Sequence, residues 1–168
     1  MASRATQHFK RRSRPQEKLM SVNVRIAKVS DLDQVAVLFD EYRQFYEQPA
    51  NAALARSFMA SRLSEGSSLV LVTETSGGEI VAFTQLYPLF DSVGAVPSFI
   101  LYDLFVSERA RRQGIARALM VEAINEARRR GAGRVELQTA RDNIAAQALY
   151  EGLGWKRDND FFVYAIHP

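Results

Sequence analysis

Residues 99–119 read FILYDLFVSERARRQGIARAL, and this stretch decides the fold. Its first eight residues, 99–106, are almost wholly apolar, which is typical of a strand buried on both faces at the centre of a sheet. The charged residues 107–113 form a short connection, and we expect a helix from there to Arg130. Residues 134–140 predict another strand, so the two strands should be parallel and joined by a right-handed crossover.

The start of this helix is a candidate anion site. The first amide groups of a helix have no partner within it, and the helix dipole places positive charge there. Gly114 and Ala116 are small, so a ligand could approach the backbone, and Arg111 and Arg112 add charge. We therefore expect the backbone of Arg111-Arg112-Gln113-Gly114-Ile115-Ala116 to hold a diphosphate. Without the buried strand before it, the same string would be better interpreted as an ordinary helix start with solvated arginines.

Two other phosphate-binding patterns are excluded by the sequence. The P-loop string G-x-x-x-x-G-K-[ST] does not occur anywhere in the chain. The dinucleotide fingerprint G-x-G-x-x-G needs three glycines, and only Gly114 is present. The diphosphate must therefore be recognised by a different arrangement.

Residues 103–119 resemble motif A of the GCN5-related N-acetyltransferase (GNAT) superfamily, which has the pattern Q/R-x-x-G-x-G/A between a central strand and a helix. Arg111, Gly114 and Ala116 match that pattern. The resemblance extends over nearly the whole chain from about Val22 onward. It implies an α/β (α+β) fold with a mixed, mostly antiparallel central sheet, a parallel splayed strand pair and flanking helices.

A second segment strengthens the resemblance. Residues 137–140, followed by Asn143-x-x-Ala146-x-x-x-Tyr150 and Leu153-Gly154-Trp155, resemble a later motif of the same family. The two motifs at this spacing are far more specific together than either is alone. Phe45-Tyr46 and Gln85-Leu86-Tyr87 are also similar to the branch that contains fungal histone and polyamine acetyltransferases.

The resemblance implies transfer of an acetyl group from acetyl-CoA to an amine by direct attack in a ternary complex. The backbone of Leu104, Phe105 and Val106 would bind the pantetheine arm, and Asn143, Ala146 and Tyr150 would lie beside it. Tyr150 is the expected general acid, and its alternative is a half-buried core aromatic. Asp103 could be the general base through a water, or a buried carboxylate satisfied by backbone amides.

The acceptor is expected between the first two helices and the loop 90–97. Tyr42, Tyr46, Gln85 and Tyr87 could line its site, although each also fits a core position. A small-molecule amine and a lysine-containing peptide are both open as acceptors. A rival hypothesis is a non-catalytic acetyl-CoA-binding sensor or scaffold, and a homodimer is an open option.

Composition narrows the other classes of function. The chain has 168 residues, no cysteine and two histidines, His8 and His167, which argues against a metal site or a Ser-His-Asp triad. The absence of cysteine fits a reducing compartment, so we expect a cytoplasmic protein. No apolar run approaches the roughly 18 residues of a membrane span.

The positive charge is confined to the amino terminus. Residues 1–19 carry a net +5 and the rest of the chain −2, for a total of +3. We expect residues 1–19 to be a basic, disordered leader and residues 20–168 to be the acetyltransferase domain; Met20-Ser21 could be the true start, and a transit peptide is another option. Nucleic acid is not an expected partner, since Arg128-Arg129-Arg130 suits the last turn of a helix.

The remaining pattern predicts an order of β-α-α-β-β-β-α-β-α-β around one sheet. A strand is expected at 22–28, and Ser30 and Asp33 suggest a capping box for the helix that follows. The further elements expected are a helix at 51–64, a hairpin of strands at 68–75 and 79–86, a loop at 90–97, a helix at 143–153, and last strands at Trp155 and 161–166.

Overall fold

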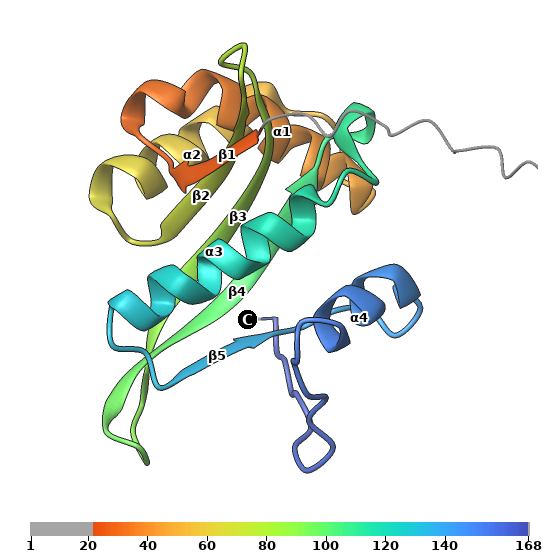
Figure 1. Cartoon of the computed structure of the whole chain (residues 1–168). Coiled ribbons are helices and arrows are strands. Elements are labelled where there is room, and N and C mark those ends of the chain that lie inside the picture. The colour runs from red at the N-terminus through yellow and green to blue at the C-terminus, as the bar shows by residue number, and fades with distance from the viewer. Residues whose placement is uncertain (1–21, 168) are drawn as a thin grey trace, which may run out of the picture.

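Five strands form one mixed sheet in the order β1-β2-β3-β4-β5 (Figure 1). The computed structural model describes residues 22–167, so the predicted leader, residues 1–19, and the alternative start at Met20 lie outside the described residues. The strands are β1 (Val22–Ile26), β2 (Leu69–Thr75), β3 (Ile80–Asp91), β4 (Val96–Val106) and β5 (Arg134–Leu137). Neighbouring strands are antiparallel except β4 and β5, which are parallel as predicted.

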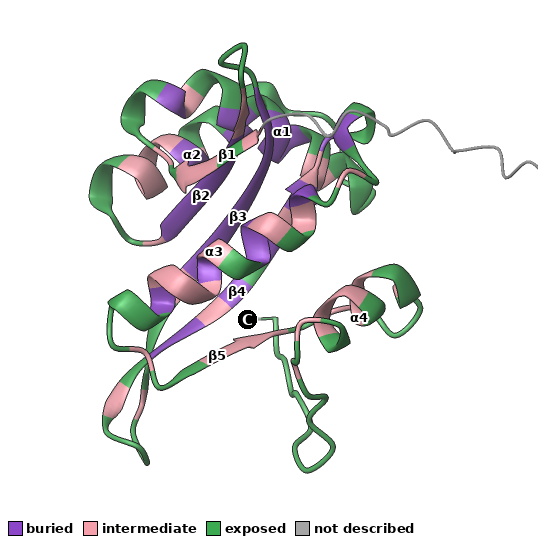
Figure 2. Ribbon diagram, in the orientation of Figure 1, coloured by how far each residue is buried: buried purple, intermediate pink, exposed green. Residues whose placement is uncertain are grey.

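Helices cover both faces of the sheet (Figure 1). They are α1 (Leu32–Phe45), α2 (Ala52–Glu65), α3 (Ile115–Arg129) and α4 (Ile144–Glu151), with short 3₁₀ turns η1 (Val29–Asp31) and η2 (Glu108–Ala110). One apolar cluster joins α1 and α2 to the sheet, and a second joins α3 to its other face. The central strands between these two clusters are buried, whereas α4 and the carboxyl end are mostly exposed (Figure 2).

The central strand β4 carries side chains into both layers. Phe105 packs with Phe83 in the α1–α2 layer, and Leu101 packs in the α3 layer. Residues 99–106 thus form a strand with buried side chains on both faces, as predicted, except at Tyr102, which is 60% exposed. The amphipathic α3 presents Leu119 and Met120, both fully buried, to the same α3 layer.

The splayed strand pair arises where β4 leaves β5. Their pairing ends at Leu101 and Leu137. On the other edge of β4, Asp103 pairs with Gln85, and Leu101 pairs with Leu86, so Tyr102 is the extra residue of a β-bulge. A bulge bends and twists its strand. Beyond Leu101, the edge of β4 that faces away from β3 has no strand partner among residues 22–167.

The predicted capping box at Ser30 and Asp33 is wrong. Asp31 accepts a hydrogen bond from the backbone N–H of Lys28 (2.7 Å) and pairs with Arg25 of β1 (2.7 Å). Asp33 instead lies on the exposed side of α1, where it pairs with Arg56. The acid that caps the start of this helical segment is therefore Asp31, two residues before the predicted Asp33, because Arg25 pairs with it.

The predicted loop at 90–97 is mostly strand. β3 continues to Asp91 and β4 begins at Val96, with Phe90 opposite Pro97, so only residues 92–95 form the turn. The carboxylate of Asp91 accepts hydrogen bonds from the N–H groups of Val93 and Gly94, both at 3.0 Å. This turn lies at the far end of the sheet from α1 (Figure 1), so it does not flank a site at the first helices.

The predicted last strands at Trp155 and 161–166 are absent. Residues 155–167 have no strand hydrogen bonds, because their apolar pattern meets no neighbouring strand in the described chain. Large apolar side chains there are 73–90% exposed (Figure 2), namely Phe161, Phe162, Val163, Tyr164 and Ile166. β5 is therefore an edge strand of the described sheet. The predicted strand at 134–140 is also shorter, since β5 ends at Leu137.

Candidate active site

A cleft of about 350 Å³ lies where β4 and β5 diverge. It is bounded by β4 on one side, by α4 on the other, and by the end of α1. The residues that line it are Tyr42, Phe45, Tyr46, Leu101, Tyr102, Leu104, Phe105, Val106, Arg111, Ala116, Gln138, Thr139, Asn143, Ala145, Ala146, Leu149 and Tyr150. The structure thus brings together residues from both sequence motifs.

The amino end of α3 faces this cleft and is not sealed by a side chain. Gly114 is the N-cap with φ of 77°, and none of the described side chains caps that end. The first helical hydrogen bond there runs from Ala118 N–H to the Gly114 carbonyl (3.0 Å), so the amides before it keep no helical acceptor. A Cβ on Gly114 would meet no atom within 4 Å. These features fit a diphosphate held by main-chain N–H groups.

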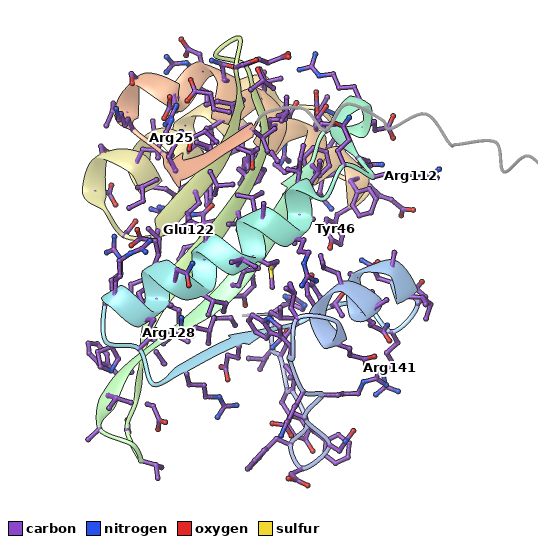
Figure 3. The ribbon with its side chains drawn as sticks, viewed as in Figure 1. Arg25, Tyr46, Arg112, Glu122, Arg128 and Arg141 are labelled. Atoms are coloured by element: carbon purple, nitrogen blue, oxygen red, sulfur yellow. The ribbon has the colours of Figure 1, made fainter. Side chains whose placement is uncertain are left out.

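The side chains of the cradle, residues 111–116, differ in how far they are buried and in where they point. Ile115 is buried in the core at 2% exposure, so only its amide is available to a ligand. Arg112 has a positive φ of 63° and its side chain points away from α4 into solvent (Figure 3). Gln113 is partly exposed.

The guanidinium of Arg111 is held by neighbouring groups rather than pointing freely into solvent at the edge of the cleft. Its guanidinium lies 5.9 Å from the ring centre of Phe45 and 5.7 Å from that of Phe105. Its Nε donates to the Val106 carbonyl (3.0 Å). Cation–π contacts of this kind join the end of α1 to β4 and fix one wall of the cleft.

Asn143 and Tyr150 form the opposite wall. The side-chain oxygen of Asn143 accepts a hydrogen bond from Ala146 N–H (3.2 Å) and caps α4, as predicted for a capping asparagine. Tyr150 is half-buried and packs near Trp155, with ring centres 6.3 Å apart. Burial, with a smaller contribution from nearby Tyr46, raises the pKa of Tyr150. Tyr46 itself is 53% exposed and lies in the gap between α3 and α4 (Figure 3).

Asp103 lies behind this cleft on the α1–α2 face of β4. It is 8% exposed, and this burial raises the pKa of its carboxyl, while hydrogen bonding by Tyr42 opposes the rise. Burial, followed by the charge of Asp103, raises the pKa of Tyr42 far above its usual range. No backbone N–H among the described residues donates to this carboxylate. Asp103 is therefore paired with a phenol, a partner that the sequence did not reveal.

The other predicted acceptor residues lie close to Asp103. Gln85 is fully buried on β3 directly opposite Asp103, and Tyr87 is two residues further along. Sequence reasoning missed Tyr102 and Leu149, which carry no motif signal, whereas Phe45 belongs to a pair that the sequence had singled out. Gln138 and Thr139 could have been found, since they directly follow β5 at the point of divergence.

Two absences concern the described residues alone. Between residues 22 and 167, no three His, Cys, Asp or Glu side chains come close enough together to hold a metal ion. None of the helices formed by those residues is both long and apolar enough to cross a membrane.

Comparison with known proteins identifies the family. Residues 35–155 match the Acetyltransferase (GNAT) family. The chain is 40% identical over 146 residues to the uncharacterized N-acetyltransferase YhfO of Bacillus subtilis, covering 87% of this chain and 97% of that protein. It is 35% identical over 102 residues to human N-acetyltransferase 8, covering 61% of this chain but 44% of that protein.

A solved structure agrees with these relatives. A crystal structure described as that of a probable acetyltransferase superposes with a TM-score of 0.83 at 33% identity, covering 87% of this chain and 97% of that one. A superposition of this extent supports the fold described above. The chain therefore belongs to the GNAT family and is an N-acetyltransferase.

Proposed function

We propose that the chain moves an acetyl group from acetyl-CoA to the primary amine of a small molecule or of a lysine side chain, by direct attack in a ternary complex. The observation that carries this proposal is the unsealed amino end of α3, next to a central strand whose outer edge is unpaired. A diphosphate and an extended arm need those two features side by side. We also propose that residues 20–168 form the acetyltransferase domain and that the protein is cytoplasmic.

The cofactor would lie along the cleft, from α3 to the end of α4. The backbone of residues 111–116 would hold the diphosphate, and the free edge of Leu104, Phe105 and Val106 would hold the pantetheine arm. Asn143, Ala146 and Tyr150 would face that arm from α4. When bound, acetyl-CoA supplies a thioester whose C–S bond breaks as the new N–C bond to the amine forms.

Two side chains would handle the protons. Tyr150 would donate its proton to the departing sulfur: a phenol carries its proton at neutral pH, and burial raises the pKa of this one. Asp103 would take the proton from the amine, directly or through a water, while the Tyr42 hydroxyl stabilises its carboxylate form. Main-chain N–H groups on the free edge of β4 could stabilise charge that develops on the acyl oxygen.

The acceptor would approach from the α1–α2 side of β4. Tyr42, Tyr46, Gln85 and Tyr87 would line its path, because all four lie near Asp103 or at the mouth of the cleft. Aromatic rings next to a carboxylate suit an amine that arrives as a cation.

Turnover and binding test the proposal separately. Calorimetry with coenzyme A should show binding to the folded protein, and release of free thiol should follow when acetyl-CoA is supplied with small amines or histone-like peptides. Tyr150→Phe should lower turnover at neutral pH at least tenfold, by analogy with typical contributions of a positioned acid. Binding without turnover on any amine would favour the sensor or scaffold alternative, and an unchanged Tyr150→Phe rate would remove this residue from the mechanism.

We further propose that two copies pair through the carboxyl-terminal residues 161–166 and the free edge of β5. The three aromatic rings of this segment are 79–90% exposed. If all were covered, they would bury on the order of 500 Å² per copy. Two copies would then bury about 1,000 Å², the lower bound of a specific interface. Light scattering should show twice the mass of the chain, and a chain ending at Asp160 should be monomeric; a monomeric full chain would refute the pairing.

A further inference from the structure

A group of polar side chains next to Asp103 is only partly satisfied. Gln85 is 0% exposed and lies directly across from Asp103, so both side chains occupy the same face of the sheet. Its Nε2 donates to Ser68 Oγ (2.7 Å) and to the Tyr87 hydroxyl (2.9 Å). Its Oε1 is buried and accepts no hydrogen bond from residues 22–167. A buried acceptor atom next to the proposed base is therefore unpaired within the described part of the chain.

A cation completes this group from α2. The side chain of Arg62 is 26% exposed, and its Nε is buried without a partner among the described residues. Its guanidinium lies 5.0 Å from the ring centre of Phe58, and its ion pair with the largely exposed Glu65 is long at 3.6 Å. Arg62 is thus held on α2 by Phe58, with a weak anionic partner within residues 22–167.

Tyr87 lies between the two charges. The carboxylate of Asp103 raises the pKa of the Tyr87 hydroxyl, after burial, whereas the guanidinium of Arg62 lowers it. Ser68, Tyr87 and Arg62 are all partly exposed, so the group is open to solvent on the side away from the core. A carboxylate and a guanidinium thus both lie near one partly exposed phenol.

The polar atoms of Gln85, Asp103 and Arg62 would suit a ligand that has both a hydrogen-bond donor and an acceptor. A buried polar atom without a partner is destabilising and rare in native proteins, so each instance needs an explanation. Gln85 Oε1 and the Asp103 carboxylate accept N–H donors, and Arg62 donates to an anion. An amine alone would satisfy the first pair and would bring a cation close to Arg62.

We propose that Arg62, Gln85 and Tyr87 form a subsite for an acceptor that carries a carboxylate near its amine, such as a free amino acid. The amine would face Gln85 and Asp103, and the carboxylate would face Arg62. This assignment rests on the proposed function and narrows its acceptor to small zwitterions, in preference to polyamines or protein lysines.

The test uses matched pairs that differ only in the carboxylate. Phenylalanine is compared with 2-phenylethylamine, and leucine with 3-methylbutylamine, as acceptors of full-length protein. We expect kcat/KM to be at least tenfold higher for the amino acid of each pair. Arg62→Gln should reduce that preference to threefold or less, chiefly by lowering kcat/KM for the amino acid of each pair.

The control is Arg56→Gln on the same helix, which removes an exposed guanidinium paired with exposed Asp33. It should keep the preference of the native chain. Equal or faster rates with the plain amines, or equal effects of the two arginine variants, would overturn the subsite. If no amine is acetylated, the proposed function fails, and the subsite is then tested by calorimetry of the same pairs on coenzyme A-loaded protein. The subsite is supported if the amino acids bind more tightly than the plain amines and if Arg62→Gln removes that difference. Any other pattern refutes it.

Discussion

Replacing Gly114 by Ala separates the strain of the backbone from the binding of the cofactor. Gly114 has φ of 77° at the amino end of α3, and Gly131 has φ of 76° just beyond the carboxyl end of the same helix. A Cβ at either position would meet no atom within 4 Å, so neither variant introduces a clash. The two variants thus share the same conformational cost and differ in which end of α3 they alter.

The expected magnitudes follow from these two facts. A left-handed conformation costs an L-residue about 1–2 kcal/mol, so both variants should lose that much unfolding free energy. The Cβ of Gly114→Ala would additionally stand where the diphosphate approaches the amides of the first turn. Loss of one charge-assisted hydrogen bond, about 1.5–3 kcal/mol, corresponds to roughly a ten- to hundredfold weaker Kd for coenzyme A.

Urea unfolding and calorimetry measure the two quantities on the same samples. Gly131→Ala should lose stability and bind coenzyme A like the native chain, whereas Gly114→Ala should lose both. Equal coenzyme A affinities for the two folded variants would show that the diphosphate does not lie at this helix end, and the cradle would have to be abandoned.

Two further predictions concern Asp103. Tyr42→Phe keeps the ring contacts to Phe83 and Phe105 but removes the hydroxyl that stabilises the Asp103 carboxylate. The acid limb of the pH profile of kcat/KM should therefore move about one to two pH units upward. An unmoved limb would refute the pairing of Tyr42 with Asp103. Tyr164→Phe, whose hydroxyl belongs to a 90% exposed residue, is its control. Burial raises the pKa of Asp103 on folding, so the contribution of this carboxyl to stability is lost as pH rises through that pKa. Asp103→Asn should therefore unfold at a higher urea concentration than the native chain at pH 7.5, and the difference should vanish near pH 4. A difference in urea midpoint that does not depend on pH would contradict this sign.

The sequence predicted the elements whose signals are local. The apolar run 99–106, the helix after Gly114 and the short helix after Asn143 all depend on neighbours within a few residues, and the structure contains each of them. The predicted Ser30–Asp33 box failed because Arg25, on another strand, pairs with Asp31 instead. Residues 161–166 carry a strand pattern, but a pattern does not supply the partner that a strand needs.

In the candidate site, too, the sequence predicted what local patterns determine and missed contacts between distant residues. Motif spacing placed Ala116, Asn143 and Tyr150 around one cleft, because a parallel pair with a helical crossover brings those segments together. The contact between Tyr42 and Asp103 joins residues 61 positions apart, and no spacing rule indicates it. Arg111 was expected to meet the ligand, yet the rings of Phe45 and Phe105 on two other elements hold its guanidinium.

The construction of the cradle explains why so few side chains define it. Phe105 and Ile115 are proposed to offer main-chain groups to the cofactor, and their side chains are 7% and 2% exposed in the two apolar layers. Each buried side chain fixes the backbone that carries the binding group, so a donor aimed at the ligand needs no reordering when the ligand arrives. On this proposal, the same residues serve core packing with their side chains and cofactor binding with their backbone. A substitution that loosens the core at Ile115 should therefore weaken cofactor binding without altering any group that touches the cofactor.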